Sequence, residues 1–237
     1  MVSSPFGGVD SFDRALWEVV CEALQMDFSD GRVLDVGCGR ALVASPLEQR
    51  GAKYFGLDLL SSFESRPPSR FCLGEAGALP FDDGAFDRVL CFDAFEHFAD
   101  PAQAAKEFSR VLQPGGFIFL SIPNYFNVAG IVKWFAETFG RYEKNSWAPF
   151  GGWTAQAKEH FVTPGKVKRW FRGAGLKRGR CIGLDREVVS GLFPWQELPS
   201  LPEAIRFRLQ LHGQTVKRFL ARNLPTASLH LFWKFER

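Results

Sequence analysis

A glycine-rich turn that follows an acidic residue is the segment of this chain best suited to bind a ligand. The run VLDVGCGRA (33–41) starts as a short apolar strand, reaches Asp35 and turns through Gly37 and Gly39 toward a helix. Glycine allows a backbone to turn tightly and to approach a ligand closely. The run therefore predicts a ligand-binding loop between the first strand and the first helix of a nucleotide-binding α/β sheet.

A second acid has the spacing expected of a ribose contact. The apolar run KYFGLDLL carries Asp58, 23 residues after Asp35. An acid about 20 residues beyond the glycine loop, at the end of the second strand, is placed to bind both hydroxyls of a ribose.

The spacing of the glycines argues against a dinucleotide. A dinucleotide site needs G-x-G-x-x-G/A, and counting from Gly37 puts Leu42 at the third position. That third glycine permits the close helix packing that accommodates a pyrophosphate. Leu42, with an acid two residues before Gly37, favours a nucleoside ligand that carries a positive charge. The adenosyl part of S-adenosylmethionine (SAM) fits this description.

Four motifs in order resemble those of the class I SAM-dependent methyltransferases: VLDVGCGRA, GLDLL, GEAGALPFDDGAFDRVLCFDAFEHF and RVLQPGGFIFLSIPN. The chain is most similar to the small-molecule group that includes the ubiquinone-pathway O-methyltransferases. The similarity covers residues 33–124 closely and 160–176 loosely. It implies a Rossmann-like α/β fold, with a seven-stranded, mostly parallel sheet, an antiparallel last strand, helices on both faces and a helical, aromatic lid.

The resemblance also implies which residues hold SAM. They are Asp35, Gly37, Cys38, Gly39, Asp58, Leu59, Glu75, Ala76 and Phe92. The first four surround the methionine part, Asp58 holds the ribose, the next three lie beside the adenine, and Phe92 ends the fourth strand against the cofactor. Glu75 stands where the family more often has Asp. The two aspartates have a structural alternative as caps of the following turns, and Phe92 has one as a core residue.

Two histidines are the candidates for a general base, because imidazole titrates near neutral pH. His97 follows the fourth strand in FEHF, and His160 lies in EHFVTP before the helix that leads to the sixth strand. Each has a structural alternative, a backbone hydrogen bond for His97 and a loop anchor for His160. His212 and His230 are expected to be structural. No cluster has metal-ligand spacing, so no metal is expected.

The length of 237 residues and the hydrophobic content of 46% predict one domain over 1–237. We expect its core at about 30–124, 160–184 and 228–235, with lid insertions at about 125–155 and 185–225. Hydrophobic periodicity predicts strands at 32–36, 53–57, 71–73, 87–92, 117–122, 180–189 and 228–236. It predicts helices at 12–24, 42–50, 101–112, 163–171 and 203–222. Pro114-Gly115-Gly116 is expected to precede the fifth strand, and the last strand to be half-buried.

Aromatic residues gather in the predicted lid, where they suit a small acceptor that is apolar, aromatic or lipid-like. The alternative is that they form the lid's own core. They are Tyr125, Phe126, Trp134, Phe135, Phe139, Trp147, Phe150, Trp153, Phe193 and Trp195.

Charge is divided unevenly along the chain. Residues 1–152 hold 13 Lys or Arg against 20 Asp or Glu, whereas residues 153–237 hold 16 against 6. This asymmetry predicts either an anionic partner near the C-terminal part or a solvated basic face.

The predicted helix near 203–222 is both apolar and basic. It spaces Ile205, Leu209, Val216, Phe219 and Leu220 along one face, near Arg206, Arg208, Lys217, Arg218 and Arg222. Such a helix is suited to weak contact with an anionic membrane. The alternative is an ordinary lid helix.

Two further function classes compete with a small-molecule enzyme. A nucleic-acid modifier would use the basic tail, but the chain has no recognisable RNA-binding module and has FDAFEHF where a base methyltransferase carries (D/N)PPY. We therefore expect no nucleic-acid partner. A cofactor-binding subunit without catalysis is disfavoured by the intact Asp35, Gly37, Gly39 and Asp58.

Cysteine usage and hydropathy predict the compartment. The five cysteines are scattered and form no C-x-x-C, which suits reduced thiols. The first residues carry no secretory pattern, and no run approaches 18 uncharged apolar residues. We therefore expect a cytoplasmic protein, and as a further expectation peripheral contact with a membrane.

Overall fold

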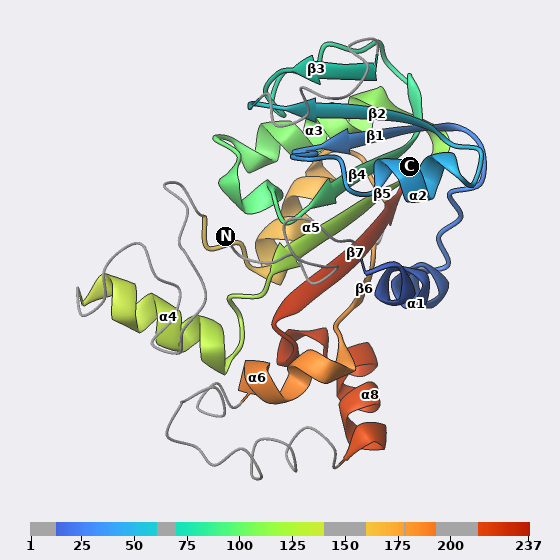
Figure 1. Cartoon of the computed structure of the whole chain (residues 1–237). Coiled ribbons are helices and arrows are strands. Elements are labelled where there is room, and N and C mark those ends of the chain that lie inside the picture. Colours follow the sequence, from blue (N-terminus) through green and yellow to red (C-terminus); the bar gives the residue numbers. More distant parts are fainter. Residues whose placement is uncertain (1–12, 61–69, 140–159, 178, 193–212) are drawn as a thin grey trace. The chain divides into compact units, whose positions relative to one another are not determined.

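A computed structural model gives the structure of residues 13–60, 70–139, 160–177, 179–192 and 213–237 (Figure 1). Seven strands form one sheet in the order β3-β2-β1-β4-β5-β7-β6. The strands are β1 (Arg32–Val36), β2 (Lys53–Asp58), β3 (Phe71–Leu73), β4 (Phe86–Phe92), β5 (Leu112–Pro123), β6 (Arg180–Ile182) and β7 (His230–Glu236).

The central strands are parallel. β1 pairs in parallel with β2 and β4, β2 with β3, and β4 with β5. β7 is antiparallel. The predicted Rossmann-like α/β fold is therefore confirmed. Because β1 to β4 run in the same direction, their carboxyl ends lie at one edge of the sheet, where α/β proteins bind ligands.

Helices cover both faces of the sheet. In the described parts of the chain, the helices of four residues or more are α1 (Arg14–Leu24), α2 (Ala44–Glu48), α3 (Pro101–Val111), α4 (Val128–Thr138), α5 (Pro164–Gly173), α6 (Val188–Leu192) and α8 (Gln214–Asn223). α1 and α2 lie on one face, and α3 and α5 on the other (Figure 1). The Asp100 carboxylate caps α3 by accepting from Ala102 N and Gln103 N, both at 3.0 Å, and Pro101 opens the helix. This start confirms the predicted Asp-Pro signal.

Aromatic packing fixes α1 against the sheet. Trp17 is 1% exposed. Its ring centroid lies 5.2 Å from those of Phe28 and Phe119 and 5.4 Å from that of Phe92. Large buried rings dominate core energetics, so α1 contributes to the core beside β4 and β5.

The chain divides into two compact units. The larger unit comprises Ser3–Ile122, Gly165–Arg180 and Trp233–Arg237, and the smaller comprises Met1–Val2, Pro123–Pro164 and Cys181–Phe232. Each unit is described separately below.

The predicted start of the fifth strand is wrong. β5 begins at Leu112, so that Pro114-Gly115-Gly116 lies inside the strand. Phe86 pairs with Leu112, but Arg88 pairs with Phe117. The extra residues form a bulge, and bulges are where a strand tolerates Pro and Gly.

Two other boundaries and the burial of the last strand also differ from the prediction. β6 covers only the first three residues of 180–189, because a 3-10 turn (Asp185–Glu187) and α6 follow. α2 is five residues long instead of spanning 42–50, and its N-terminal Val43 makes no side-chain cap. β7 is buried on both faces instead of one, since Leu231, Phe232 and Trp233 are each at most 1% exposed.

The structure describes only the second half of the predicted helix near 203–222. α8 buries Lys217 and Ala221 and exposes Val216 (60%) and Phe219 (63%). The apolar positions Val216 and Phe219 therefore face solvent, and Leu220 is half-buried. Ile205, Arg206, Arg208 and Leu209 lie outside the described residues, as do Phe12, Trp147, Phe150, Trp153, Phe193, Trp195 and His212.

Within the described ranges, none of the helices is long and apolar enough to cross a bilayer.

Candidate functional site

The glycine loop after β1 is held by the ends of its neighbouring strands. Gly37 N and Cys38 N donate to Leu57 O at 2.8 and 3.1 Å. Gly37 has φ +76°, and a Cβ there would lie 2.5 Å from Ala94 Cβ. Glycine is therefore required at this position. The loop lies against both the end of β2 and the residues that follow β4.

Gly39 occupies the open side of the same loop. Its φ is +48°, and an added Cβ would meet no atom within 4 Å. Gly39 N donates to Asp58 Oδ2 at 2.7 Å. The structure thus brings together the loop and the acid that the sequence paired with it, and leaves space beside Gly39 for a ligand.

The Asp58 carboxylate also organises the turn after β2. Its Oδ1 accepts from Leu60 N at 3.0 Å, so the turn-capping alternative is part of its role. A carboxylate offers about four lone-pair sites. Two remain for the hydroxyls of a ribose.

Asp35 is the most unusual group at this edge of the sheet. It is 3% exposed, its Oδ2 accepts from Tyr54 Oη at 2.6 Å, and its Oδ1 has no hydrogen-bond partner among the described residues. Burial, with a smaller contribution from the Asp58 charge, raises the pKa of Asp35 to about 7 against the effect of the Tyr54 bond. A buried oxygen without a hydrogen-bond partner costs folding free energy. A ligand with a cationic or hydrogen-bonding group would supply the missing partner.

The sequence analysis missed Tyr54. β1 and β2 pair Asp35 with Gly56 and Val33 with Tyr54. Tyr54 and Gly56 stand two positions apart on the same face of β2, so the Tyr54 hydroxyl reaches the Asp35 carboxylate diagonally across the strand pair. A polar aromatic residue inside the second strand was the available signal.

These three groups fit SAM. Asp35 Oδ1 offers a buried anionic partner for its cationic methionine part, Asp58 retains sites for the ribose, and Gly39 leaves room for close approach.

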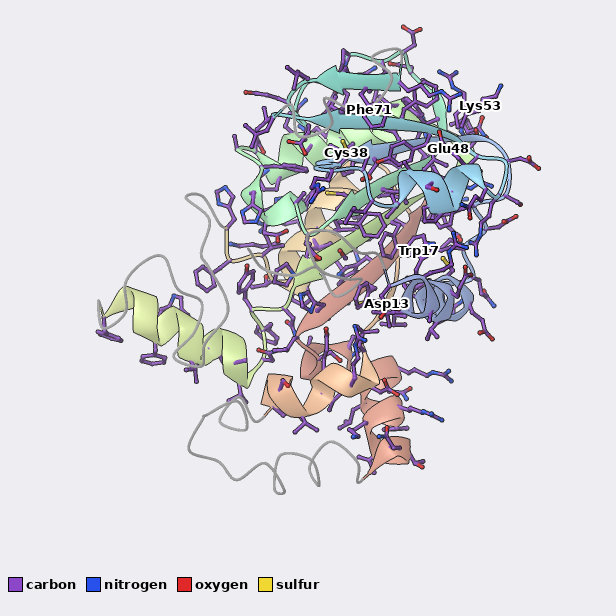
Figure 2. All side chains as sticks on the ribbon, in the orientation of Figure 1. Asp13, Trp17, Cys38, Glu48, Lys53 and Phe71 are labelled. Carbon is purple, nitrogen blue, oxygen red and sulfur yellow. The ribbon has the colours of Figure 1, made fainter. Side chains whose placement is uncertain are left out.

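Cys38 is packed inside the loop. It is 8% exposed, and its Sγ lies 2.8 Å from where a Cβ on Gly56 would be. Figure 2 shows Cys38 in the loop after β1 and Phe71 on β3. Burial raises the pKa of the Cys38 thiol, so it is not an activated nucleophile.

The other residues assigned to the cofactor lie at or just after the ends of β2, β3 and β4 in the same unit. Leu59 is 63% exposed, Glu75 is exposed and Ala76 is buried. Phe92 packs against Trp17 and Phe119, which is the core alternative. Contacts of these four residues with the cofactor stay predictions.

The two candidate bases fall in different units. His97, in the 3-10 turn Phe95–His97, belongs to the larger unit. Its backbone N donates to Ala94 O at 3.0 Å, and its Nε2 lies 3.7 Å from the buried Glu96 Oε1. Because Ala94 and Phe98 are the side chains nearest to Gly37, the His97 turn adjoins the glycine loop. His160 is exposed in the smaller unit.

His230 has a structural role. His230 Nδ1 lies 2.8 Å from Glu187 Oε1, and its backbone N donates to Glu187 Oε2 at 2.9 Å. Both residues are buried in the smaller unit. The expectation for His230 is confirmed.

Asp93 is a second residue that the sequence analysis missed. It follows β4 with φ +43°, a conformation that non-glycine residues rarely adopt. Its Oδ1 accepts from Ser121 Oγ at 2.8 Å, and its N donates back to Ser121. Strained residues of this kind cluster at functional sites. The sequence offered no signal for Asp93, because its strained conformation depends on its contacts with Ser121 of β5.

In the parts of the chain that the structure describes, no three His, Cys, Asp or Glu side chains form a group suited to a metal ion.

The chain matches known methyltransferases in sequence. Residues 34–120 match the family model described as "Methyltransferase domain". A ubiquinone biosynthesis O-methyltransferase of Chromobacterium violaceum is 34% identical over 201 residues, which cover 78% of this chain and 83% of the relative. The protein of the same name from Xanthomonas euvesicatoria is 30% identical over 210 residues, 83% of this chain and 77% of the relative.

Solved structures share the fold at lower identity. A methyltransferase bound to the Trm112 activator from Haloferax volcanii aligns with a TM-score of 0.58 at 21% identity, over 93% of this chain and 89% of that one. A SAM-dependent methyltransferase from Mesorhizobium loti aligns with a TM-score of 0.56 at 16% identity, over 94% and 98%. With the glycine loop, Asp35 and Asp58 at the carboxyl edge of the sheet, these matches show that the chain belongs to the class I SAM-dependent methyltransferases.

Proposed function

We propose that this methyltransferase transfers the methyl group of SAM to a hydroxyl oxygen of a small aromatic or lipid-like molecule. The observation that carries the proposal is the 34% identity to an O-methyltransferase over most of both chains. The cofactor-binding edge built from Asp35, Gly39 and Asp58 supports the methyl donor.

The protein's part in such a reaction is positioning and proton removal. SAM, when bound, supplies a methyl group on a positively charged sulfur that a nucleophile displaces in line. Good alignment of reactants is worth roughly 7–11 kcal/mol. A phenol, with a pKa of about 10, also needs a base, and a hydroxyl that keeps its proton is a poor nucleophile. We assign the removal of the acceptor's proton to His97, because the turn that holds His97 adjoins the glycine loop.

The smaller unit exposes aromatic rings to solvent. Phe126, Trp134, Phe135 and Phe139 lie on or beside α4 and are 48–65% exposed. Solvent-facing rings of this size suit apolar ligands or partners. Tyr125 instead packs on Phe161, with ring centroids 4.9 Å apart, which supports the core alternative for that residue.

A transfer assay with SAM labelled in its methyl group tests the proposed function. The full chain is incubated with separate small-molecule, RNA and protein fractions of a cell extract. We expect the label in the small-molecule fraction, in a product that behaves as an ether. Label in the RNA fraction would show that the acceptor is RNA and not a small molecule. Binding of S-adenosylhomocysteine without transfer to any fraction would favour a non-catalytic subunit.

We also infer that α8 makes weak contact with an anionic membrane surface. The described residues of α8 expose Val216 and Phe219, and Leu224 follows at 51% exposed. Arg218 and Arg222 are exposed beside them. Lys217, one of the five cations predicted to face lipid, is 6% exposed and does not contribute. Each exposed cation is worth about 1 kcal/mol near an anionic bilayer.

Co-sedimentation with phosphatidylglycerol and phosphatidylcholine vesicles checks this inference. We expect salt-sensitive binding to the anionic vesicles alone, and its loss in Phe219→Glu. The matched control is Val19→Glu on α1, since Val19 is also exposed at 58%. Equal sedimentation with both vesicles, or equal loss in both variants, would contradict a role for α8.

A further inference from the structure

The larger unit contains a cavity of about 330 Å³ that includes none of the cofactor residues. The side chains of Lys168, Arg172 and Lys177 line it together with Leu176, Gly179 and Phe235. All six belong to α5, to the segment after it or to the end of β7.

The cavity lies at the edge of the sheet opposite to the glycine loop. Lys177 N donates to Glu236 O at 2.8 Å, and Arg237 N donates to Gly116 O at 3.1 Å. Gly116 is near the start of β5, whereas the cofactor residues follow the carboxyl ends of β1 to β4. A ligand here would not compete for the cofactor site.

The floor of the cavity is rigid and apolar. Phe235 is 2% exposed, and its ring stacks on Phe171 with centroids 4.3 Å apart and planes 4° apart. Trp233 stacks on Phe235 at 5.6 Å. Lys168 Nζ lies 5.6 Å from the Trp233 ring centroid, a cation–π distance. The aromatic stack therefore fixes both the floor and one of the cations.

Among the described residues, no carboxylate forms an ion pair with Lys168, Arg172 or Lys177, although the charge of Lys177 contributes to lowering the pKa of Glu236. The sequence from 160 to 184 holds seven Lys or Arg and no Asp or Glu. The neighbouring carboxylate, Glu236, pairs with Lys234 Nζ at 2.8 Å. Lys168 and Arg172 stand four residues apart on α5, where like charges destabilise a helix. A bound anion would offset the repulsion between these two cations.

Capping of α5 does not explain these cations. Gly175 N donates to Arg172 O at 3.0 Å, and Leu176 N donates to Phe171 O at 3.1 Å. Ala174 N donates to Trp170 O at 2.9 Å. This backbone pattern satisfies the last carbonyls of the helix, so the side chains are not needed for that purpose.

We propose that this cavity binds a small phosphorylated molecule, with its phosphate among Lys168, Arg172 and Lys177 and its apolar part on Leu176 and Phe235. Arginine and lysine are the usual phosphate-binding side chains. The cavity volume is within the range of small-molecule sites, about 300–1,000 Å³. A nucleic-acid strand fits less well, because strand binding uses exposed rings for base stacking and the only ring in this lining is buried.

Calorimetric titration of the full chain with inorganic pyrophosphate at low salt tests the proposal. We expect saturable binding of one pyrophosphate, weakened at least tenfold in Arg172→Ala and in Lys177→Ala. The matched control is Arg169→Ala, which removes an exposed cation of the same helix outside the cavity and should change affinity less than twofold. Unchanged S-adenosylhomocysteine affinity in every variant shows that the protein is folded.

Three results would overturn the proposal. Binding that does not saturate, or that weakens equally in Arg169→Ala, would mean diffuse attraction by a basic surface. Binding to phosphatidylglycerol vesicles that depends on Arg172, without pyrophosphate binding, would assign the cations to lipid. The same dependence with a short RNA alone would assign them to nucleic acid.

Discussion

Replacing His97 with alanine is expected to lower the turnover number of methyl transfer by about 10²–10⁴, the usual contribution of a general base. The affinity for S-adenosylhomocysteine should change less than about twofold, because His97 N makes its backbone bond in either variant. Initial rates at saturating SAM and acceptor measure the first effect, and calorimetry measures the second.

Two control variants separate a base from a structural histidine. His97→Gln keeps a hydrogen-bonding side chain but cannot take the proton, so it should be as slow as His97→Ala. Recovery of the rate in His97→Gln would mean that His97 only anchors its turn. His160→Ala is the parallel test in the smaller unit. A large loss there, with none at His97, would move the base to His160.

The affinity for S-adenosylhomocysteine is expected to weaken about tenfold for each pH unit below 7, or about a hundredfold by pH 5. Burial raises the pKa of Asp35 to about 7 in the ligand-free protein, and we propose that the ammonium group of the ligand pairs with the ionised form. Binding below pH 7 must then release the Asp35 proton. The ligand's own amino group, with a pKa of about 7.7–8.0, stays charged over this range.

Calorimetry at several pH values, in buffers of different ionisation enthalpy, measures both the affinity and the released proton. The Asp35→Asn variant should bind S-adenosylhomocysteine weakly at every pH, and its binding should release no proton. Tyr54→Phe removes a hydrogen bond that lowers the pKa of Asp35. The inflection in the plot of affinity against pH should therefore move above pH 7 in this variant. Constant affinity from pH 5 to 7 in the wild-type chain would contradict the pairing.

The same carboxyl affects stability without ligand. The folded chain holds its proton up to about pH 7, whereas an unfolded chain releases it near the ordinary value of 3.8. The folded state therefore binds more protons between these values. Its contribution to stability falls as the pH rises through them.

The sequence predicts those parts of this site that short, local motifs encode. The strand–glycine–helix pattern located Gly37 and Gly39, and the spacing to Asp58 was confirmed by the 2.7 Å bond between Gly39 N and Asp58 Oδ2. These features depend on backbone conformation and strand ends, which short patterns encode. The seven-stranded sheet with its antiparallel last strand was implied by the resemblance to the methyltransferase family.

Features that depend on distant packing were not predictable. Tyr54 reaches Asp35 diagonally across the register of β1 and β2, and Asp93 is held in its strained conformation beside Ser121 of β5. The bulge in β5 turned an apparent boundary, Pro114-Gly115-Gly116, into strand interior. In α8, packing between elements distant in the sequence buries Lys217 and leaves Phe219 exposed, which the helical spacing alone does not report.

Calorimetric titration of S-adenosylhomocysteine into the wild-type chain and Asp58→Ala tests the cofactor site most directly. Hydrogen bonds to a charged group are worth about 1.5–3 kcal/mol, so we predict at least a tenfold loss of affinity in Asp58→Ala. Asp83→Ala, at an exposed carboxylate paired with Arg110, should bind as the wild type does. Equal affinity of all three folded proteins would contradict the assignment of Asp58 to the cofactor.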